Sequence, residues 1–320
     1  MNILVTGGAG YIGSWLVPHL LADGHNVVVV DTMTFGTGHL PDNPNLKVIK
    51  ADVVMTQDWC FDRIDTVIYL AGLSNNVMCE QDLVLSVNVN VRSLRNFVKA
   101  AKANGVGRFI YASSVAVYGS SDEDSFETDA LVPTTPYAVQ KAMAEEAVMQ
   151  EASTDFNVVI TRSASVCGYS PNMAFHLTVN MMTNHAFHNR RITVNGGQQK
   201  RCHIHIQDVS TLYRRLLTIP VDIPISIYNF VAQNMTVLEA AQDVRAVMDD
   251  GTNSIQLVIG PATDDRSYTV DGSWTQKRLG WSPEYTVKDA VWDMKVRFQS
   301  HMWGDSMTNE KYGRIIQNGL

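Results

Sequence analysis

The stretch Asn2–Gly13 reads NILVTGGAGYIG, and this stretch decides the fold of the chain. Its apolar start predicts a buried strand, its glycines predict a tight turn, and the following YIGSWLVPHLLADG predicts a helix. Glycines in such a turn let backbone N–H groups approach a phosphate, and the helix N-terminus adds the positive end of its dipole. Strand, glycine turn and helix in this order indicate the first unit of a nucleotide-binding α/β sheet.

Short apolar runs alternate with helical patterns through residues 1–165. The runs are nearly continuous in Val and Ile, which predicts strands buried on both faces. Alternating strands and helices predict a parallel sheet with helices on both sides, so we expect a Rossmann-type doubly wound fold. The further apolar runs are NVVVVD, LKVIKAD, IDTVIYLAG, RFIYASS and NVVITRSASV, and the further helical patterns are DLVLSVNVNVRSLRNFVKAAKANG and TTPYAVQKAMAEEAVMQEA.

The regular alternation ends after Val166, where segments rich in Met, Asn and His follow at irregular spacing. This change predicts a smaller, mixed α/β C-terminal domain that binds the substrate. We expect the cofactor domain to comprise residues 1–165, with segments near 203–232 returning to it. We expect residues 166–202 and 233–320 to form the substrate domain, at the sheet edge where doubly wound folds bind ligands.

The composition excludes several classes of partner. The net charge is -7, with 25 basic and 32 acidic residues and no Lys/Arg run, so nucleic acid is not an expected partner. No apolar run approaches the roughly 18 residues of a membrane span. The N-terminus reads as a strand, so we expect no signal peptide. The 4 cysteines form no CxxC pair, which favours a reducing, cytoplasmic location.

The spacing of the glycines in this turn, together with an acidic residue after the next strand, indicates which cofactor to expect. Gly7, Gly10 and Gly13 fit GxxGxxG, Gly8 allows GxGxxG as well, and Asp31 ends the run NVVVVD. A carboxylate at that strand end accepts bonds from ribose hydroxyls and repels a 2′-phosphate, which favours NAD over NADP. The residues that we expect to line the cofactor are Gly7, Gly10, Tyr11, Ile12, Gly13, Asp31, Asp52, Val53, Leu70, Ala71, Gly72, Asn88, Tyr137 and Lys141.

Tyr137 and Lys141, in PYAVQK, lie four residues apart and therefore on one face of a helix. Such a pair is ordinarily a surface feature. Here it follows the glycine turn, Asp31 and a strand that ends at Ser114, and crossover topology brings these segments to one sheet edge. A free Tyr has a pKa near ~10, and a nearby ammonium with an oxidised nicotinamide would lower it towards about 7. We therefore expect Tyr137 to move a proton, Lys141 to tune it, and Ser114 to hold a substrate oxygen.

The motifs TGGAGYIG, AGL, NVN, SSVAVYG, YxxxK and KRCHIHIQD resemble the extended short-chain dehydrogenase/reductase family. They are most similar to its nucleotide-sugar epimerase branch. The resemblance implies that NAD stays bound and takes a hydride from the sugar C4 while Tyr137 takes the O4 proton. The 4-keto sugar then rotates and the hydride returns to its other face. The resemblance also implies a catalytic role for Ser114 and a supporting role for Asn88 or Asn90 at the cofactor.

Two departures from the family narrow the expected reaction. The 4,6-dehydratases carry Asp-Glu directly after the catalytic Ser/Thr, and the decarboxylases keep the Glu, whereas this chain has Val115 and Ala116. We therefore expect epimerisation at C4 rather than dehydration or decarboxylation. The run from Arg162 to Ser165 replaces the family's Arg-Tyr-Phe-Asn, so we do not expect galactose as the sugar. The alternatives are a nucleotide-sugar 4-ketoreductase and an NAD-binding sensor without turnover.

The resemblance places Asn180, Arg201 and Arg266 on the diphosphate of a nucleotide sugar. The planar guanidinium fork of Arg suits that group because it makes two charge-assisted hydrogen bonds. We leave His176 out of the candidate set, as a solvated helix residue.

Three further expectations complete the sequence analysis. In RCHIHI, Cys202 alternates with His203 and His205 on a strand, so we expect no metal site. The resemblance implies a homodimer formed by the helices that carry Asn90 and Tyr137. The tail beyond about residue 300 matches no element of the family.

Overall fold

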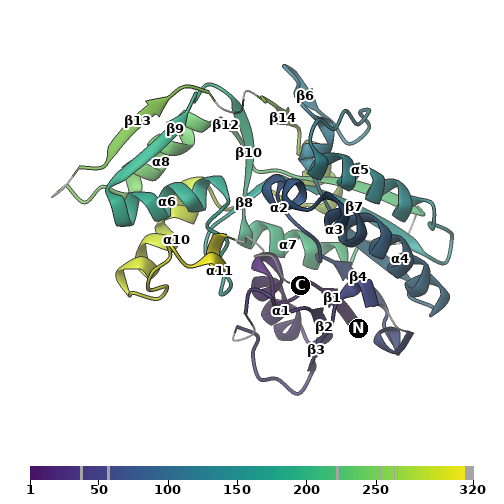
Figure 1. The fold of residues 1–320 in the computed structure, drawn as a ribbon. Helices are drawn as coiled ribbons and strands as arrows, with labels where there is room; N and C mark the ends of the chain where they lie inside the picture. Colours follow the sequence, from purple (N-terminus) through teal and green to yellow (C-terminus); the bar gives the residue numbers. More distant parts are fainter. Residues whose placement is uncertain are drawn as a thin grey trace.

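The computed structural model describes residues 1–36, 39–55, 58–220, 223–251, 254–262, 264 and 266–313. Figure 1 shows a large sheet flanked by helices, with a smaller lobe of helices and short strands beside it. The α/β class and the Rossmann-type sheet predicted from the sequence are confirmed. Our division into domains by residue number stays a prediction.

The large sheet has seven strands, and every neighbouring pair in it is parallel. The strand order reverses beside the first strand, which is the point where doubly wound sheets bind ligands. Across the sheet the strands are β11 (Ile225–Phe230), β7 (Asn157–Ser163), β5 (Arg108–Ser114), β4 (Thr66–Tyr69), β1 (Asn2–Thr6), β2 (Asn26–Asp31) and β3 (Leu46–Lys50).

Successive residues of the central strands point to opposite faces and fill two separate cores. Ile3 and Val5 belong to the core that includes α1 (Tyr11–Ala22) and α7 (Ile206–Leu216), whereas Leu4 belongs to the core beneath α4 (Leu94–Ala103) and α5 (Pro136–Met149). Burial on both faces therefore explains the continuous Val and Ile runs.

The edge strand β3 departs from the expected burial on both faces. Its middle residues Lys47 and Val48 are exposed, and Val48 keeps 46% of its surface accessible. An edge strand has a neighbour on one side only and no helix covering its outer half, and charged residues there discourage pairing with other chains.

Local sequence explains where the helices near the sheet edge begin. The Thr135 side chain caps α5 by accepting a hydrogen bond from the Ala138 N–H, and Pro136 occupies the first turn. The long helical pattern from Asp82 to Gly105 is divided by a π-helical turn. Its parts are α3 (Leu83–Val87), the π-turn η3 (Asn88–Ser93) and α4. The remaining short elements of this part of the chain are α2 (Asn76–Gln81) and the 3-10 turns η1 (Val53–Met55), η2 (Asp58–Phe61) and η4 (Val115–Tyr118).

The smaller lobe combines three minor sheets with four helices of the described chain, and Figure 1 shows it beside the sheet edge. One minor sheet contains β12 (Gln233–Thr236), β10 (Lys200–His205) and β8 (Ser165–Cys167), and two pairs join β13 (Gln256–Gly260) to β9 (Arg191–Asn195) and β14 (Thr269–Val270) to β6 (Asp124–Ser125). The helices are α6 (Thr178–Asn189), α8 (Val237–Met248), α10 (Val287–Gln299) and α11 (Glu310–Gly313). A further helix, α9 (Ser273–Leu279), packs against β11 and α7 of the large-sheet part. Within the described part of the chain, no helix has the length and apolar character that crossing a membrane requires.

Candidate active site

A cavity of about 680 Å³ follows the carboxyl ends of the central strands. Asp31 and Asp52 line one end, where β2 and β3 finish, and Ser114 and Tyr137 line the other, where β5 finishes. The ends of β1 and β4 lie between them, so the cavity spans the sheet from one side of the switch point to the other. Every residue predicted to line the cofactor lies on this cavity wall, and the individual roles stay predictions.

The glycine turn after β1 leaves no room for side chains. A Cβ on Gly13 would lie 2.5 Å from the Gly7 carbonyl oxygen, and a Cβ on Gly7 would lie 2.8 Å from the Ala71 nitrogen. Gly7 also has φ +69, which glycine adopts without strain. With Gly10 as the N-cap, α1 presents its first N–H groups to the cavity, so the residues present fit the pyrophosphate of a dinucleotide.

Asp31 joins the glycine turn to the loop that follows β2. One carboxylate oxygen accepts a 3.0 Å bond from the Ala9 N–H, and the other accepts a 2.8 Å bond from the Met33 N–H. These bonds hold the carboxylate at the cavity wall. Carboxylate oxygens accept more than one bond each, so these two bonds are compatible with acceptance from ribose hydroxyls.

The π-helical turn places Asn88 and Asn90 differently. Asn88 lines the cavity and accepts a 2.9 Å bond from Arg92. The buried Asn90 accepts a 2.8 Å bond from the Leu73 N–H and donates to the Leu73 carbonyl and, at 2.8 Å, to Gln140. Asn90 therefore supports the loop after β4 from behind.

The three residues of the predicted reacting centre meet at the sugar end of the cavity. Ser114 ends β5, Tyr137 lies in the first turn of α5, and the Ser114 hydroxyl lies close enough to the Tyr137 phenol to lower its pKa. Lys141 is 8% exposed, donates a 2.7 Å bond to the Ala112 carbonyl, and has its Nζ 5.7 Å from the centre of the Tyr137 ring. This arrangement can hold an alcohol oxygen and move its proton.

The titration of Tyr137 differs from the expectation based on Lys141. Burial raises the pKa of the Tyr137 phenol, and the hydrogen bond with Ser114 opposes that rise. Burial also lowers the pKa of the Lys141 ammonium to about 8. The protein's own groups therefore do not bring the pKa of Tyr137 near neutrality, and an oxidised nicotinamide bound beside the phenol would lower it.

A buried ion pair lies directly beneath the reacting centre. Arg162 binds Glu145 at 2.8 Å, with 3% and 0% of the two side chains exposed. Ser113, next to Ser114, donates to the same carboxylate, and Arg162 also donates at 2.8 Å to the Tyr118 hydroxyl. The network connects α5, β5, η4 and β7, so it holds in place the segments that carry the reacting residues.

The two predicted arginines share one carboxylate. Asp264 accepts from Nε and Nη2 of Arg266, at 2.8 and 2.6 Å, and from Nη2 of Arg201, at 3.0 Å. These bonds lower the pKa of Asp264 to about 2. Arg266 lines the cavity, whereas Arg201 does not and donates to the Arg266 carbonyl instead.

Asn180 also lies behind the wall rather than on it. Its oxygen accepts a 3.1 Å bond from the Gly168 N–H, and its nitrogen donates to the Tyr11 hydroxyl and the Ala174 carbonyl. The amide thus connects the glycine turn to the segment that precedes α6. Its role at the diphosphate stays a prediction, as does that of Arg201.

Sequence reasoning omitted His176 and Tyr268, which line the same cavity as Arg266. His176 lies two residues before the start of α6, so it is not the solvated helix residue that we expected. Tyr268 packs its ring 5.3 Å from the Arg201 guanidinium. The one available signal was position, since a polar residue just ahead of a helix N-terminus suits an anion site.

The sequence of residues 3–230 matches the family model described as "NAD dependent epimerase/dehydratase family". The low-salt glycan biosynthesis protein Agl12 of Haloferax volcanii is 28% identical over 305 residues, which cover 91% of this chain and 96% of that protein. The dTDP-D-glucose 4,6-dehydratase of Homo sapiens is 28% identical over 312 residues, which cover 91% of this chain and 87% of that enzyme.

One solved structure of similar fold is a complex with both a nucleotide sugar and NAD. MoeE5, in complex with UDP-glucuronic acid and NAD, is 26% identical to this chain with a TM-score of 0.82. The superposition covers 93% of this chain and 100% of that one. The likeness therefore extends over both lobes and the cavity between them.

Proposed function

Because the chain belongs to the NAD-dependent epimerase/dehydratase family, we propose that it epimerises a nucleotide-diphosphate sugar at C4 through a 4-keto intermediate. The family makes the chain an enzyme with NAD as its cofactor. One observation supports the reaction type. Ser114, Tyr137 and Lys141 meet at one end of a cavity whose opposite end carries Asp31.

The wall of the sugar end favours epimerisation over loss of water. Dehydration needs an acid and a base in addition to the tyrosine, and the dehydratases provide them as Asp-Glu. Val115 and Ala116 line the cavity at these positions and cannot exchange a proton. Among the described residues, Asp31 and Asp52 are the carboxylates on the cavity wall, and both lie at the adenosine end.

The chain's own residues have separate tasks in this reaction. Tyr137 takes the proton of the sugar O4 and later returns it, while Ser114 donates a hydrogen bond to the same oxygen. Lys141, held by the Ala112 carbonyl, keeps a positive charge beside the phenol. When bound, NAD supplies the redox chemistry at C4. Rotation of the keto sugar before the return step inverts the centre.

The diphosphate of the substrate has cationic and dipolar partners at the same end. Arg266 lines the cavity, and its Nη1 group points away from the edge that Asp264 occupies. His176 lines the cavity just ahead of α6, whose N-terminal dipole end favours an anion. These groups suit two linked phosphates better than an uncharged sugar alone.

A panel of UDP-, GDP-, CDP- and dTDP-sugars, incubated with the purified enzyme and scored by NMR, tests the proposal. We expect the 4-epimer of one substrate to form without added reductant. A 4-keto-6-deoxy product would show dehydration, and a product that needs added NADH or NADPH would show a ketoreductase. Bound NAD with no product from any sugar would favour the sensor.

We also propose a homodimer through the helices that carry Asn90 and Tyr137. Val139 and Met143 lie one turn apart on α5 and keep 40% and 44% of their surfaces exposed. Neighbouring apolar side chains on an exposed helix face favour contact with a partner. The molecular mass in solution should be twice that of the chain for the native protein, and Met143→Glu should halve it. A monomeric native protein would contradict the proposal.

A further inference from the structure

The C-terminal residues 303–313, which we call the C-terminal strap, contact both rims of the cofactor cavity. We propose that the C-terminal strap completes the cofactor site by holding these two rims together, and that it thereby slows the release of bound NAD. The proposal rests on NAD as the cofactor and does not depend on which sugar reaction the enzyme performs.

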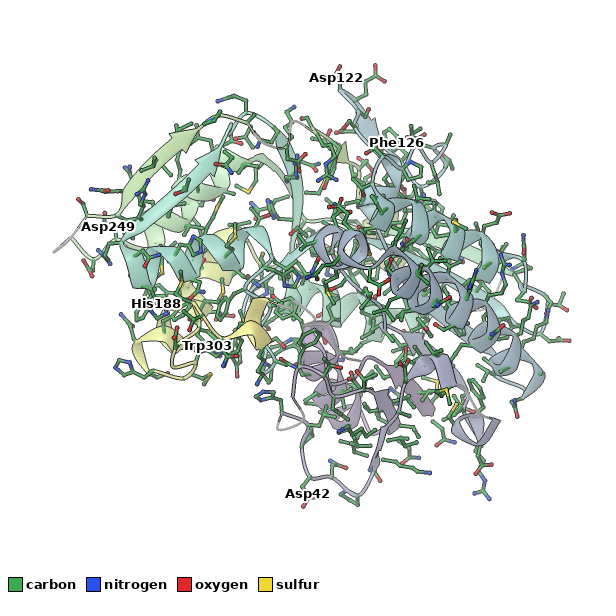
Figure 2. All side chains as sticks on the ribbon, viewed as in Figure 1. Asp42, Asp122, Phe126, His188, Asp249 and Trp303 are labelled. Atoms are coloured by element: carbon green, nitrogen blue, oxygen red, sulfur yellow. The ribbon has the colours of Figure 1, made fainter. Side chains whose placement is uncertain are left out.

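The strap begins with a firm anchor in the smaller lobe. Trp303 is 7% exposed and packs its ring 4.5 Å from that of Phe298 on α10. Ser306 is 4% exposed, donates a 2.6 Å bond to Asn184, and lies 2.9 Å from His188, both on α6. Figure 2 shows Trp303 close to His188 among these helices. The first part of the strap, which follows α10 in the chain, is therefore fixed to the smaller lobe.

The strap then contacts the rim that precedes α6. The Tyr312 carbonyl accepts a 2.9 Å bond from the Phe175 N–H, and the two rings meet edge to face at 5.5 Å. The Trp303 ring also meets the Phe175 ring edge to face, with the ring centres 5.2 Å apart. The neighbours of Phe175, Ala174 and His176, both line the cavity. Movement of this rim away from the cavity thus disturbs the strap.

The strap also contacts the opposite rim, the loop that follows Asp31. Lys311 Nζ lies 3.3 Å from Nε2 of His39 and 3.2 Å from the place where a Cβ on Gly36 would be. Gly36 and its neighbour Phe35 line the cavity beside Asp31. Figure 1 shows α11, which carries Lys311 and Tyr312, between α10 and the elements of the N-terminal sheet.

These contacts link two rims that must separate when a dinucleotide leaves by this side. Loops that close over a ligand commonly set the rate of its release, because they open before it departs. Contacts that exist only while the rims are together stabilise the closed form and reduce the population of the open one. The strap makes such contacts with both rims through adjacent residues, Lys311 and Tyr312, so it behaves as a single bridge.

Removal of residues 310–320 tests the proposal directly. Radiolabelled NAD is bound to the protein and chased with excess unlabelled NAD, with no sugar present, and retention is followed over time. We expect about tenfold faster release from the shortened chain, equivalent to about 1.4 kcal/mol. The matched control ends at Gly313, keeps the strap, and should release NAD at the rate of the full chain.

Two point variants guard against a chain that folds poorly after shortening. Lys311→Ala removes the contact of the strap with the loop that follows Asp31. Tyr312→Ala removes the ring contact of the strap with the rim that precedes α6. Each variant should speed the release of NAD by a smaller factor than the deletion does. Thermal stability is compared at saturating NAD, because loss of a ligand by itself lowers the melting temperature. Unchanged release from the shortened chain and from both point variants overturns the proposal. Faster release from the chain ending at Gly313 overturns it too, because the effect would then lie beyond the strap.

Discussion

The cofactor end of the cavity is built around a glycine turn and a strand-end carboxylate that lie close together in the sequence, whereas the sugar end joins side chains from distant segments. Gly7, Gly13 and Asp31 belong to one strand–helix–strand unit at the start of the chain. His176, Arg266 and Tyr268 come from the smaller lobe and meet only through its folding.

The difference teaches which kind of change each end tolerates. The glycine turn is limited by contact distances, since a Cβ on Gly13 would lie 2.5 Å from backbone atoms that cannot move aside. The positions of Arg201 and Arg266 depend on charge, because Asp264 holds both guanidiniums at hydrogen-bond distance at a partly exposed site. Overpacking a rigid turn costs ~1–3 kcal/mol, while a partly exposed ion pair contributes little because solvent screens it.

The largest expected effect lies in the reacting centre at the sugar end. Tyr137→Phe removes the hydroxyl that moves the proton, so kcat should fall about a thousandfold while NAD remains bound. Steady-state kinetics and the NAD content of the purified variant measure the two quantities. Tyr228→Phe, a buried tyrosine of β11, is the matched control and should retain kcat. Activity of Tyr137→Phe within tenfold of the wild type would remove Tyr137 from the proton transfer.

The next effect tests the steric limit of the cofactor end. Gly13→Ala should weaken NAD binding by up to about a hundredfold, because overpacking against rigid neighbours costs ~1–3 kcal/mol. Calorimetric titration with NAD gives the dissociation constant. Gly107→Ala is the control, since a Cβ there would have its nearest neighbour 3.7 Å away. Equal NAD affinity in both variants would show that the turn yields more easily than its distances indicate.

The third effect concerns pH at the sugar end. The pKa of Lys141 is about 8, so its charge is lost as pH rises through that value, and kcat should fall roughly tenfold per unit above it. Stability should change in the opposite sense. Between pH 8 and 10.5 the unfolded chain binds the proton that the folded chain has released, so the free energy of unfolding rises with pH.

A pH series of kcat and of denaturant unfolding measures both trends. Lys141→Met removes the titrating group, so its unfolding free energy should lack the rise across this range. A native kcat that stays level up to about pH 10 would show that Lys141 remains charged or that its charge is not needed.

The smallest expected effect concerns the ion pair between Asp264 and Arg266 at the sugar end. Asp264→Asn should raise KM for the nucleotide sugar up to about fivefold, because the Arg266 fork loses its partner, while kcat and NAD affinity stay unchanged. The pKa of Asp264 is about 2, so the effect should be the same from pH 5 to pH 8. Asp250→Asn, in an exposed pair with Arg190, is the control. A lower KM for Asp264→Asn would mean that Asp264 competes with the substrate.

Local sequence was sufficient for the cofactor end because its geometry is set within a few residues. The turn needs glycines at Gly7 and Gly13, and the strand end needs its carboxylate at Asp31, so the pattern in the chain is the pattern in space. The order of strands and helices likewise follows from their periodicity, because the core on each face selects it. The edge position of β3 was not visible, since strand order is a property of the whole sheet.

At the sugar end, the residues chosen by motif do not all lie on the cavity wall. Asn180 and Arg201 fit the family's positions by sequence, and both side chains lie behind the wall and bind protein atoms, so their roles at the diphosphate stay predictions. His176 lines the cavity, and its one local signal was its position just ahead of a helix N-terminus. The direction of a side chain in an irregular segment depends on what packs behind it, here Phe175 and the C-terminal strap.

The sequence by itself determined the parallel sheet, the glycine turn, Asp31 and the Ser114–Tyr137–Lys141 set, because steric and periodic constraints act over short distances along the chain. Only the tertiary structure decided that Asp264 joins two arginines, that His176 faces the cavity, and that the C-terminal strap spans its rims. Those contacts join segments separated by long stretches of chain, and their free energy exists only after the lobes have packed together.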